Sequence, residues 1–81
     1  MHPTQTIIHH LAQLCAIDPA AIRADAWLIE YGLDSVRSLE LVLTLERHFN
    51  IELPEDEIVR VVTVGDLIRL IERQVTPPYL A

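Results

Sequence analysis

Large apolar residues recur at helical spacing in successive segments of this sequence, and residues that break helices separate the segments. In the first segment the pattern marks one helical face, with apolar residues at Ile7, Ile8, Leu11, Leu14 and Cys15. Asp18 ends this segment, because the residue before a proline is pushed out of the helical region. The whole pattern predicts an all-α fold, a four-helix bundle of three main helices and a short third one. The predicted helices cover residues 5–16, 35–49, 55–61 and 64–75, and a long loop joins the first two.

The long loop from Ile17 to Asp34 carries too many large apolar side chains to be fully solvated. We expect it to pack across the end of the bundle through Ile22, Trp27, Leu28, Ile29 and Leu33. Trp27 is interpreted as an anchor that holds the loop down, rather than as a platform for a ligand.

The predicted second helix has one broad apolar arc, which should face the core. Its members are Leu39, Leu41, Val42, Leu45 and Phe49. Val36 and Leu43 lie at the border between this arc and the charged face. Further along the chain, the core is expected to be closed by Ile58, Val61 and Val62.

Composition and charge restrict the class of protein. The 81 residues suit a single domain covering residues 1–81, and no apolar run approaches the roughly 20 residues of a membrane span. The net charge of −6 opposes binding to nucleic acid and favours protein partners with basic patches. The amino terminus lacks the pattern of a secretory signal, so we expect a cytoplasmic protein. Cys15 has no partner for an internal disulfide and is predicted to be a buried thiol.

The segment Gly32-Leu33-Asp34-Ser35-Val36 leads from a glycine-marked loop into the second helix. Asp34 or Ser35 can cap this helix, because a short side-chain oxygen accepts a hydrogen bond from a free amide of the first turn. Ser35 is therefore predicted to be exposed at a helix start. The free amides and the helix dipole there favour negative charge, so a phosphate on the Ser35 oxygen would lie in a favourable field.

These residues resemble the phosphopantetheine attachment site of acyl carrier proteins and of the related thiolation domains of polyketide and nonribosomal peptide synthesis. The resemblance continues over nearly the whole chain, through Glu40-Leu41, Phe49, Leu53-Pro54-Glu55 and the segment 63–67. It implies that Ser35 receives a 4'-phosphopantetheine arm from coenzyme A, and that a phosphopantetheinyl transferase reads Asp34 and Gly32. Magnesium and a general base in the transferase would activate the serine. The chain itself would be a monomeric carrier and not an enzyme.

The resemblance also implies a docking surface on the second helix. Its predicted members are Val36, Arg37, Glu40, Leu43 and Arg47, together with Glu55. Fatty-acid-synthesis members of the family usually have acids where Arg37, Arg47 and His48 stand, which argues against docking on generic fatty-acid enzymes. The implied partners are an acyl-loading ligase or acyltransferase and a ketosynthase, a condensation-type enzyme or another acyl-processing enzyme.

The cargo stays open at this stage. We expect acyl intermediates, held as thioesters, of a lipid, polyketide or other specialised pathway; the alternative is an aryl or aminoacyl carrier loaded by an adenylating ligase. Whether the chain is freestanding or part of a larger synthase is also open. If a pocket for the cargo opens between the helices, Leu43, Val59 and Val62 are candidates to line it, although core packing is the simpler interpretation.

Other classes of function fit less well. A serine nucleophile of the Gly-x-Ser-x-Gly type needs a strand before it and a nearby histidine, whereas His48 lies about 20 Å from Ser35 along a helix. His9 and His10 lack a Cys or carboxylate partner at ligand spacing, so no metal site is predicted. A small helical interaction module without a prosthetic group, in which Ser35 is only a helix cap, is the alternative of another class.

Overall fold

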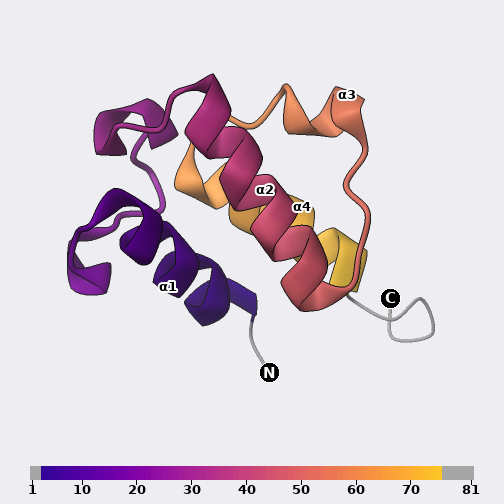
Figure 1. Cartoon of the computed structure of the whole chain (residues 1–81), viewed down its shortest axis with the longest axis horizontal. Coiled ribbons are helices and arrows are strands. Elements are labelled where there is room, and N and C mark those ends of the chain that lie inside the picture. The colour runs from indigo at the N-terminus through magenta and orange to yellow at the C-terminus, as the bar shows by residue number, and fades with distance from the viewer. Residues whose placement is uncertain (1–2, 76–81) are drawn as a thin grey trace.

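The computed structural model describes residues 3–75 and is all-α, as the sequence predicts. Its helices are α1 (Pro3–Cys15), α2 (Ser35–Phe49), α3 (Glu55–Ile58) and α4 (Val64–Val75), shown in Figure 1. Two short 3₁₀ helices, η1 (Pro19–Ala21) and η2 (Leu28–Tyr31), lie in the loop between α1 and α2. Helix α1 packs against both α2 and α4. None of the helices within residues 3–75 is long and apolar enough to cross a membrane.

Helices α2 and α4 have the predicted bounds, whereas α1 and α3 differ from the prediction. Helix α1 begins at Pro3, a position where proline is tolerated because the first amides of a helix have no partner within it. It ends before Ala16, whose φ of 57° is left-handed. Helix α3 ends at Ile58 instead of 61, because the next turn tightens: the Val61 amide bonds to the Ile58 carbonyl.

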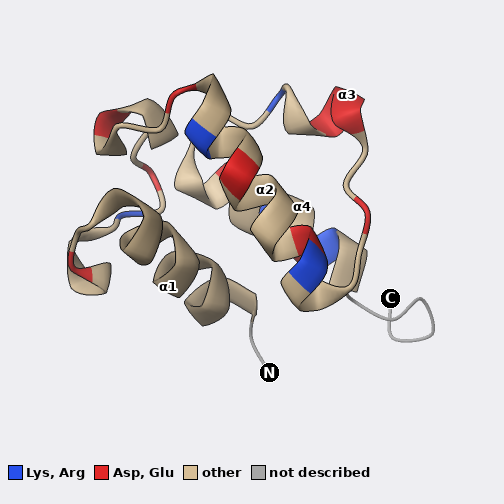
Figure 2. Cartoon of the chain, viewed as in Figure 1, with Lys and Arg blue, Asp and Glu red and all other residues tan. Residues whose placement is uncertain are grey.

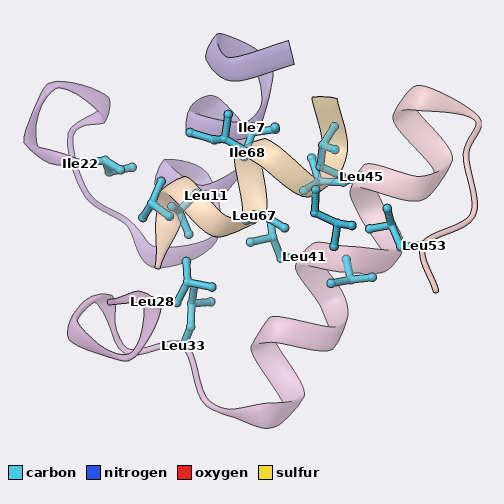
Figure 3. Close-up of a cluster of buried hydrophobic side chains, with 14 of the residues drawn as sticks. Ile7, Leu11, Ile22, Leu28, Leu33, Leu41, Leu45, Leu53, Leu67 and Ile68 are labelled. Carbon is cyan, nitrogen blue, oxygen red and sulfur yellow. The ribbon is translucent and has the colours of Figure 1, made fainter. Parts of the chain in front are cut away.

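The core is made only of apolar side chains from α1, α2, α4 and the connecting segments (Figure 3). Leu11, Leu45 and Ile71 are completely buried, one from each main helix. Among the described residues, no polar or charged side chain belongs to the buried set. Burial of each Leu or Ile contributes about 1.5–3 kcal/mol, so this cluster supplies most of the driving force for the fold.

The loop between α1 and α2 packs across the bundle end through only some of its predicted residues. Ile22, Leu28 and Leu33 are buried, but Trp27 and Ile29 are 57% and 69% exposed, so their predicted packing is wrong. Backbone contacts, rather than the Trp27 ring, hold the segment around Trp27. Trp27 forms an isolated antiparallel bridge with Thr63, and the Leu28 amide donates to the Val62 carbonyl at 2.9 Å. Trp27 precedes η2, and Leu28, the first residue of η2, is the side chain that enters the core.

Two further residues were predicted to face the core and do not. Leu39 is 57% exposed and Val62 is 45% exposed. The buried part of α2 is narrower than the apolar arc of its sequence and consists of Leu41, Val42 and Leu45. Ile58 and Val61 are partly buried and pack against the core as predicted, although α3 contains no fully buried residue.

Candidate functional site

The turn before α2 is fixed by Gly32 and Leu33. Gly32 ends η2 with φ of 82°, a left-handed conformation that favours glycine, and its amide donates to the Ile29 carbonyl at 3.0 Å. A Cβ at this position would meet no atom within 4 Å, so the backbone angle, and not a lack of space, is what favours glycine there. Leu33 is 4% exposed and anchors the turn in the core. The chain therefore enters α2 from a fixed point.

Asp34 is the N-cap of α2. Its Oδ1 accepts a hydrogen bond from the Arg37 amide at 2.9 Å, and its extended backbone is typical of a cap. The sequence left Asp34 and Ser35 as alternatives for this role, and the structure selects Asp34. Ser35 is thereby released from capping and becomes the first residue of the helix.

Ser35 is exposed, and its hydroxyl makes no hydrogen bond with any residue in the range 3–75. The amides of Ser35 and Val36 belong to the first turn, where no helical carbonyl can accept from them. An accessible hydroxyl beside free amides, at the positive end of a 15-residue helix, suits a covalently attached phosphodiester. The residues present thus fit a phosphopantetheine group on this oxygen.

The outer face of α2 carries an apolar stripe of three side chains, Val36, Leu39 and Leu43, which we call the α2 stripe. They are 65%, 57% and 45% exposed and stand at i, i+3 and i+7, so they lie along one side of the helix. Leu39 was predicted to face the core, and its place in this stripe was not predicted. Its spacing from Val36 and Leu43 was the signal that could have placed it with them.

The predicted docking residues are all exposed, and four of them lie along one side of α2 at i, i+4, i+7 and i+11, namely Val36, Glu40, Leu43 and Arg47. The Arg37 guanidinium reaches towards α1 and donates to the Leu14 carbonyl at 3.1 Å, satisfying one of the last carbonyls of that helix. Arg47 donates to the Leu43 carbonyl within α2 at 3.4 Å. Glu55 lies on α3. Both arginines therefore have a structural contact in addition to any role in docking.

A small apolar cavity of about 60 Å³ lies beside α2. Its walls include Ser38 and Leu41 of α2, Leu28 of η2, and Ile58 and Val61 from the α3 region. The candidates Leu43, Val59 and Val62 do not line it, because their side chains point to solvent. The cavity is far smaller than the roughly 300–1,000 Å³ of typical ligand sites, so in this conformation it is a packing gap.

The histidines and Cys15 lie away from Ser35. His10 of α1 meets His48 of α2 edge to face, with ring centres 5.1 Å apart, and His9 and Phe49 extend this contact. Desolvation, the neighbouring His48 and then His9 lower the pKa of His10 from its ordinary value. Cys15 is only half-buried, and burial raises the pKa of its thiol despite the nearby Arg37. Within residues 3–75 no group of three or more His, Cys, Asp or Glu side chains is arranged to hold a metal ion.

Residues 5–71 match the family described as "Phosphopantetheine attachment site". The chain belongs to this carrier family. Its members bear phosphopantetheine, act as acyl carriers in fatty acid or polyketide biosynthesis, and are not themselves enzymes. The expectations for fold, cofactor and carrier function are thereby confirmed.

Curated relatives of this carrier include freestanding proteins and parts of larger synthases. It is 40% identical to the acyl carrier protein of Wolinella succinogenes over 57 residues, covering 69% of this chain and 75% of that protein. It is 36% identical over 70 residues to the non-reducing polyketide synthase dbaI of Emericella nidulans, covering 86% of this chain but 3% of the synthase. The "Mupirocin didomain ACP" has the same fold, with a TM-score of 0.78 and 24% identity over 93% of this chain and 41% of that one.

Proposed function

We propose that Ser35 is the residue that carries the phosphopantetheine arm, and that Asp34 and Gly32 present it to the transferase. The observation that carries this proposal is the free, exposed Ser35 hydroxyl at the first position of α2, next to a capping Asp34. Gly32 and Leu33 hold the turn, so the hydroxyl stands in a defined place. Asp34 also adds a negative charge that suits the metal and basic surface of a transferase.

In the proposed reaction the Ser35 oxygen attacks a phosphorus of the coenzyme A pyrophosphate. The bond between the two phosphates breaks, the adenosine bisphosphate leaves, and the serine proton passes to a base of the transferase. The arm supplies a terminal thiol that holds cargo as a thioester. The role of the chain is to present this group to successive enzymes at a high effective concentration.

The proposed cargo is an acyl intermediate of a polyketide, lipid or other specialised pathway. Similarity to both acyl carrier proteins and polyketide synthases supports this range. Arg37 and Arg47 on α2 set this carrier apart from carriers with an acidic second helix, which argues for dedicated partners. We further propose a monomeric, cytoplasmic, single-domain carrier that meets an acyl-loading ligase or acyltransferase and a ketosynthase or other acyl-processing enzyme.

Intact mass tests the attachment site. The protein is incubated with coenzyme A, magnesium and a broad-specificity transferase, beside Ser35→Ala and Ser38→Ala. Ser38 is a matched control, because it lies one turn further along the same helix and lines the small cavity instead of the surface. We expect one phosphopantetheinyl group on the parent and on Ser38→Ala, and none on Ser35→Ala. Absence of the group from a folded parent, tested with more than one transferase, would leave Ser35 as part of a helix start only and would favour an interaction module.

Loading assays on the modified protein then decide the cargo. Acylation by an acyl-loading ligase or acyltransferase supports the proposed range. Efficient aminoacylation or arylation by an adenylating ligase, without acylation, would replace it with an aryl or aminoacyl carrier.

A further inference from the structure

Two histidines from different helices meet at the surface between α1 and α2. The ring centres of His10 on α1 and His48 on α2 lie 5.1 Å apart. His10 is partly buried and His48 is exposed, and neither ring makes a hydrogen bond with any residue in the range 3–75. The sequence gave no sign of this pair, because only the packing of α1 on α2 brings the two residues together.

The separation of the two rings is that of imidazoles that share one metal ion. A Zn–N bond measures about 2.0–2.1 Å, and a ring centre lies roughly 1.2 Å beyond its ligating nitrogen. At the tetrahedral angle these lengths place two ring centres about 5.2 Å apart, close to the observed 5.1 Å. The planes of His10 and His48 meet at 66°, and the last torsion of histidine is broad. Since no hydrogen bond holds either ring, small rotations can turn one nitrogen of each towards a common point.

The pair supplies two ligands, and water completes the coordination. Glu40 lines a groove together with His10, but it stands eight residues before His48, about 12 Å along α2, so it is not a third ligand. This agrees with the absence of any three-residue cluster for a metal within residues 3–75. Imidazole nitrogens suit Zn²⁺, Cu²⁺ and Ni²⁺, whereas Mg²⁺ prefers oxygen ligands.

The charge around the pair does not oppose a cation. Helix α1 contains no Lys, Arg, Asp or Glu, and it is tan along its whole length in Figure 2. Arg47 precedes His48 on α2, but its Nε donates to the Leu43 carbonyl one turn back along the helix. Histidine binds metal as the neutral imidazole, which is its main form at about pH 7.5.

We propose that His10 and His48 bind one transition-metal ion of the Zn²⁺, Cu²⁺ or Ni²⁺ type, and that this ion ties α1 to α2. The site is separate from the attachment of phosphopantetheine, because His48 lies thirteen residues from Ser35, about 20 Å along α2. A metal held by both helices stabilises the folded chain, since the unfolded chain does not keep the two histidines together.

Zinc chloride is the probe. Isothermal titration at about pH 7.5 gives the stoichiometry and dissociation constant for the parent, His10→Gln and His48→Gln. His9→Gln is the matched control, because His9 is also an exposed histidine of α1 but contacts only His10. His2 lies outside the described residues, and His2→Gln tests whether the amino terminus binds the metal instead. NMR spectra of the imidazole nitrogens identify the ligands directly, and a titration with MgCl₂ tests the choice of metal.

We expect one Zn²⁺ per chain, with the ring signals of His10 and His48 shifting together. Loss of an outer-shell partner of a metal already costs about 10–100-fold in affinity, so His10→Gln and His48→Gln should each weaken binding at least about tenfold. His9→Gln and His2→Gln should bind like the parent, and MgCl₂ should shift neither ring. The midpoint of thermal unfolding should rise with zinc concentration for the parent and for His9→Gln, but not for His48→Gln.

Four outcomes would overturn the proposal. They are absence of zinc binding by the folded parent, an equal loss in His9→Gln or His2→Gln, one zinc ion shared by two chains, and zinc binding without a rise in the unfolding midpoint. Modification of Ser35 by the transferase does not depend on any of them, so they are distinct from failure of the carrier function.

Discussion

The Asp34 carboxylate accepts a hydrogen bond from the Arg37 amide at 2.9 Å, and this contact closes the first turn of the helix that begins with Ser35. Asp34→Ala should lower the free energy of unfolding by about 0.5–2 kcal/mol, the usual cost of a lost N-cap. Asp34→Asn keeps a capping oxygen, so its free energy of unfolding should decrease much less. Urea denaturation of the three proteins measures this. If Asn and Ala are equally destabilising, the carboxylate charge matters more than the cap.

Leu39 and Leu45 allow the same substitution to be compared on two sides of one helix. Leu45 is completely buried, so Leu45→Ala should cost about 2–5 kcal/mol through lost burial and a cavity. Leu39 is 57% exposed, and Leu39→Ala should change stability by no more than about 0.5 kcal/mol. Chemical denaturation of both variants is the measurement. A large loss of stability in Leu39→Ala would show that the Leu39 side chain belongs to the core.

Gly32 should resist substitution because of its backbone angle. Gly32→Ala places a side chain at φ of 82°, which costs about 1–2 kcal/mol although no atom lies within 4 Å of the new Cβ. Gly32→Asn should be milder, because asparagine tolerates the left-handed region better. Thermal unfolding followed by circular dichroism distinguishes them, and equal stability of parent and Gly32→Ala would contradict this reading of the turn.

His10 should make the fold less stable as the pH falls. Its pKa in the fold lies below the ordinary value of 6.5, so near that pH the unfolded chain binds more protons than the folded one. The free energy of unfolding should therefore decrease as the pH drops from 7 through the folded pKa. NMR titration of the imidazole checks the cause: His48→Gln removes one neighbouring charge and should raise the pKa of His10. Glu40 of α2 is exposed and lines a surface groove together with His10 of α1, and its carboxylate is present in both proteins, so it does not affect the comparison. An unchanged pKa of His10 in His48→Gln would contradict the contribution of His48, which comes second to desolvation.

Asp66 should have a separate effect at lower pH. Hydrogen bonds from the Thr63 and Val62 amides are the main causes that lower the pKa of this carboxyl below its usual 3.8. The stability that they provide is present above pH 4 and is lost as the pH falls through the folded pKa. Asp66→Ala should remove this acid dependence and cost about 0.5–2 kcal/mol near neutral pH. Asp56→Ala, at an exposed acid on α3 without a side-chain bond, is the control for denaturation curves between pH 6 and 3.

The helices and the site could be predicted because their determinants are local. The spacing of apolar residues set α2 and α4, and the short side chains of Asp34 and Ser35 marked the start of α2. The exposure of Ser35 at a helix start was predicted from the same capping residues and from Gly32 before them. The family resemblance then supplied the cofactor, which no physical property of the sequence indicates.

The wrong predictions of burial have a common physical cause. The local pattern of apolar residues does not show which other elements pack against each side of a helix or loop. Leu39 belongs to the apolar arc of α2 but is 57% exposed, because the spacing of apolar residues does not show which side of a helix another element covers. Trp27 was expected to anchor the loop by its ring, whereas a backbone bridge to Thr63 holds the segment and leaves the ring exposed. Such long-range backbone pairing has no signal in the spacing of residues.

The bridge between Trp27 and Thr63 has a spectroscopic consequence. Trp27 is the single tryptophan of the sequence, and its indole is already 57% exposed in the folded chain. Its emission wavelength should thus shift little when the helices melt. The same indole is held beside the start of α4, so a molecule that settles over this end of the bundle should move the emission to the blue. Trp27 is therefore a built-in fluorophore that can report association. Its emission should change little when the chain unfolds.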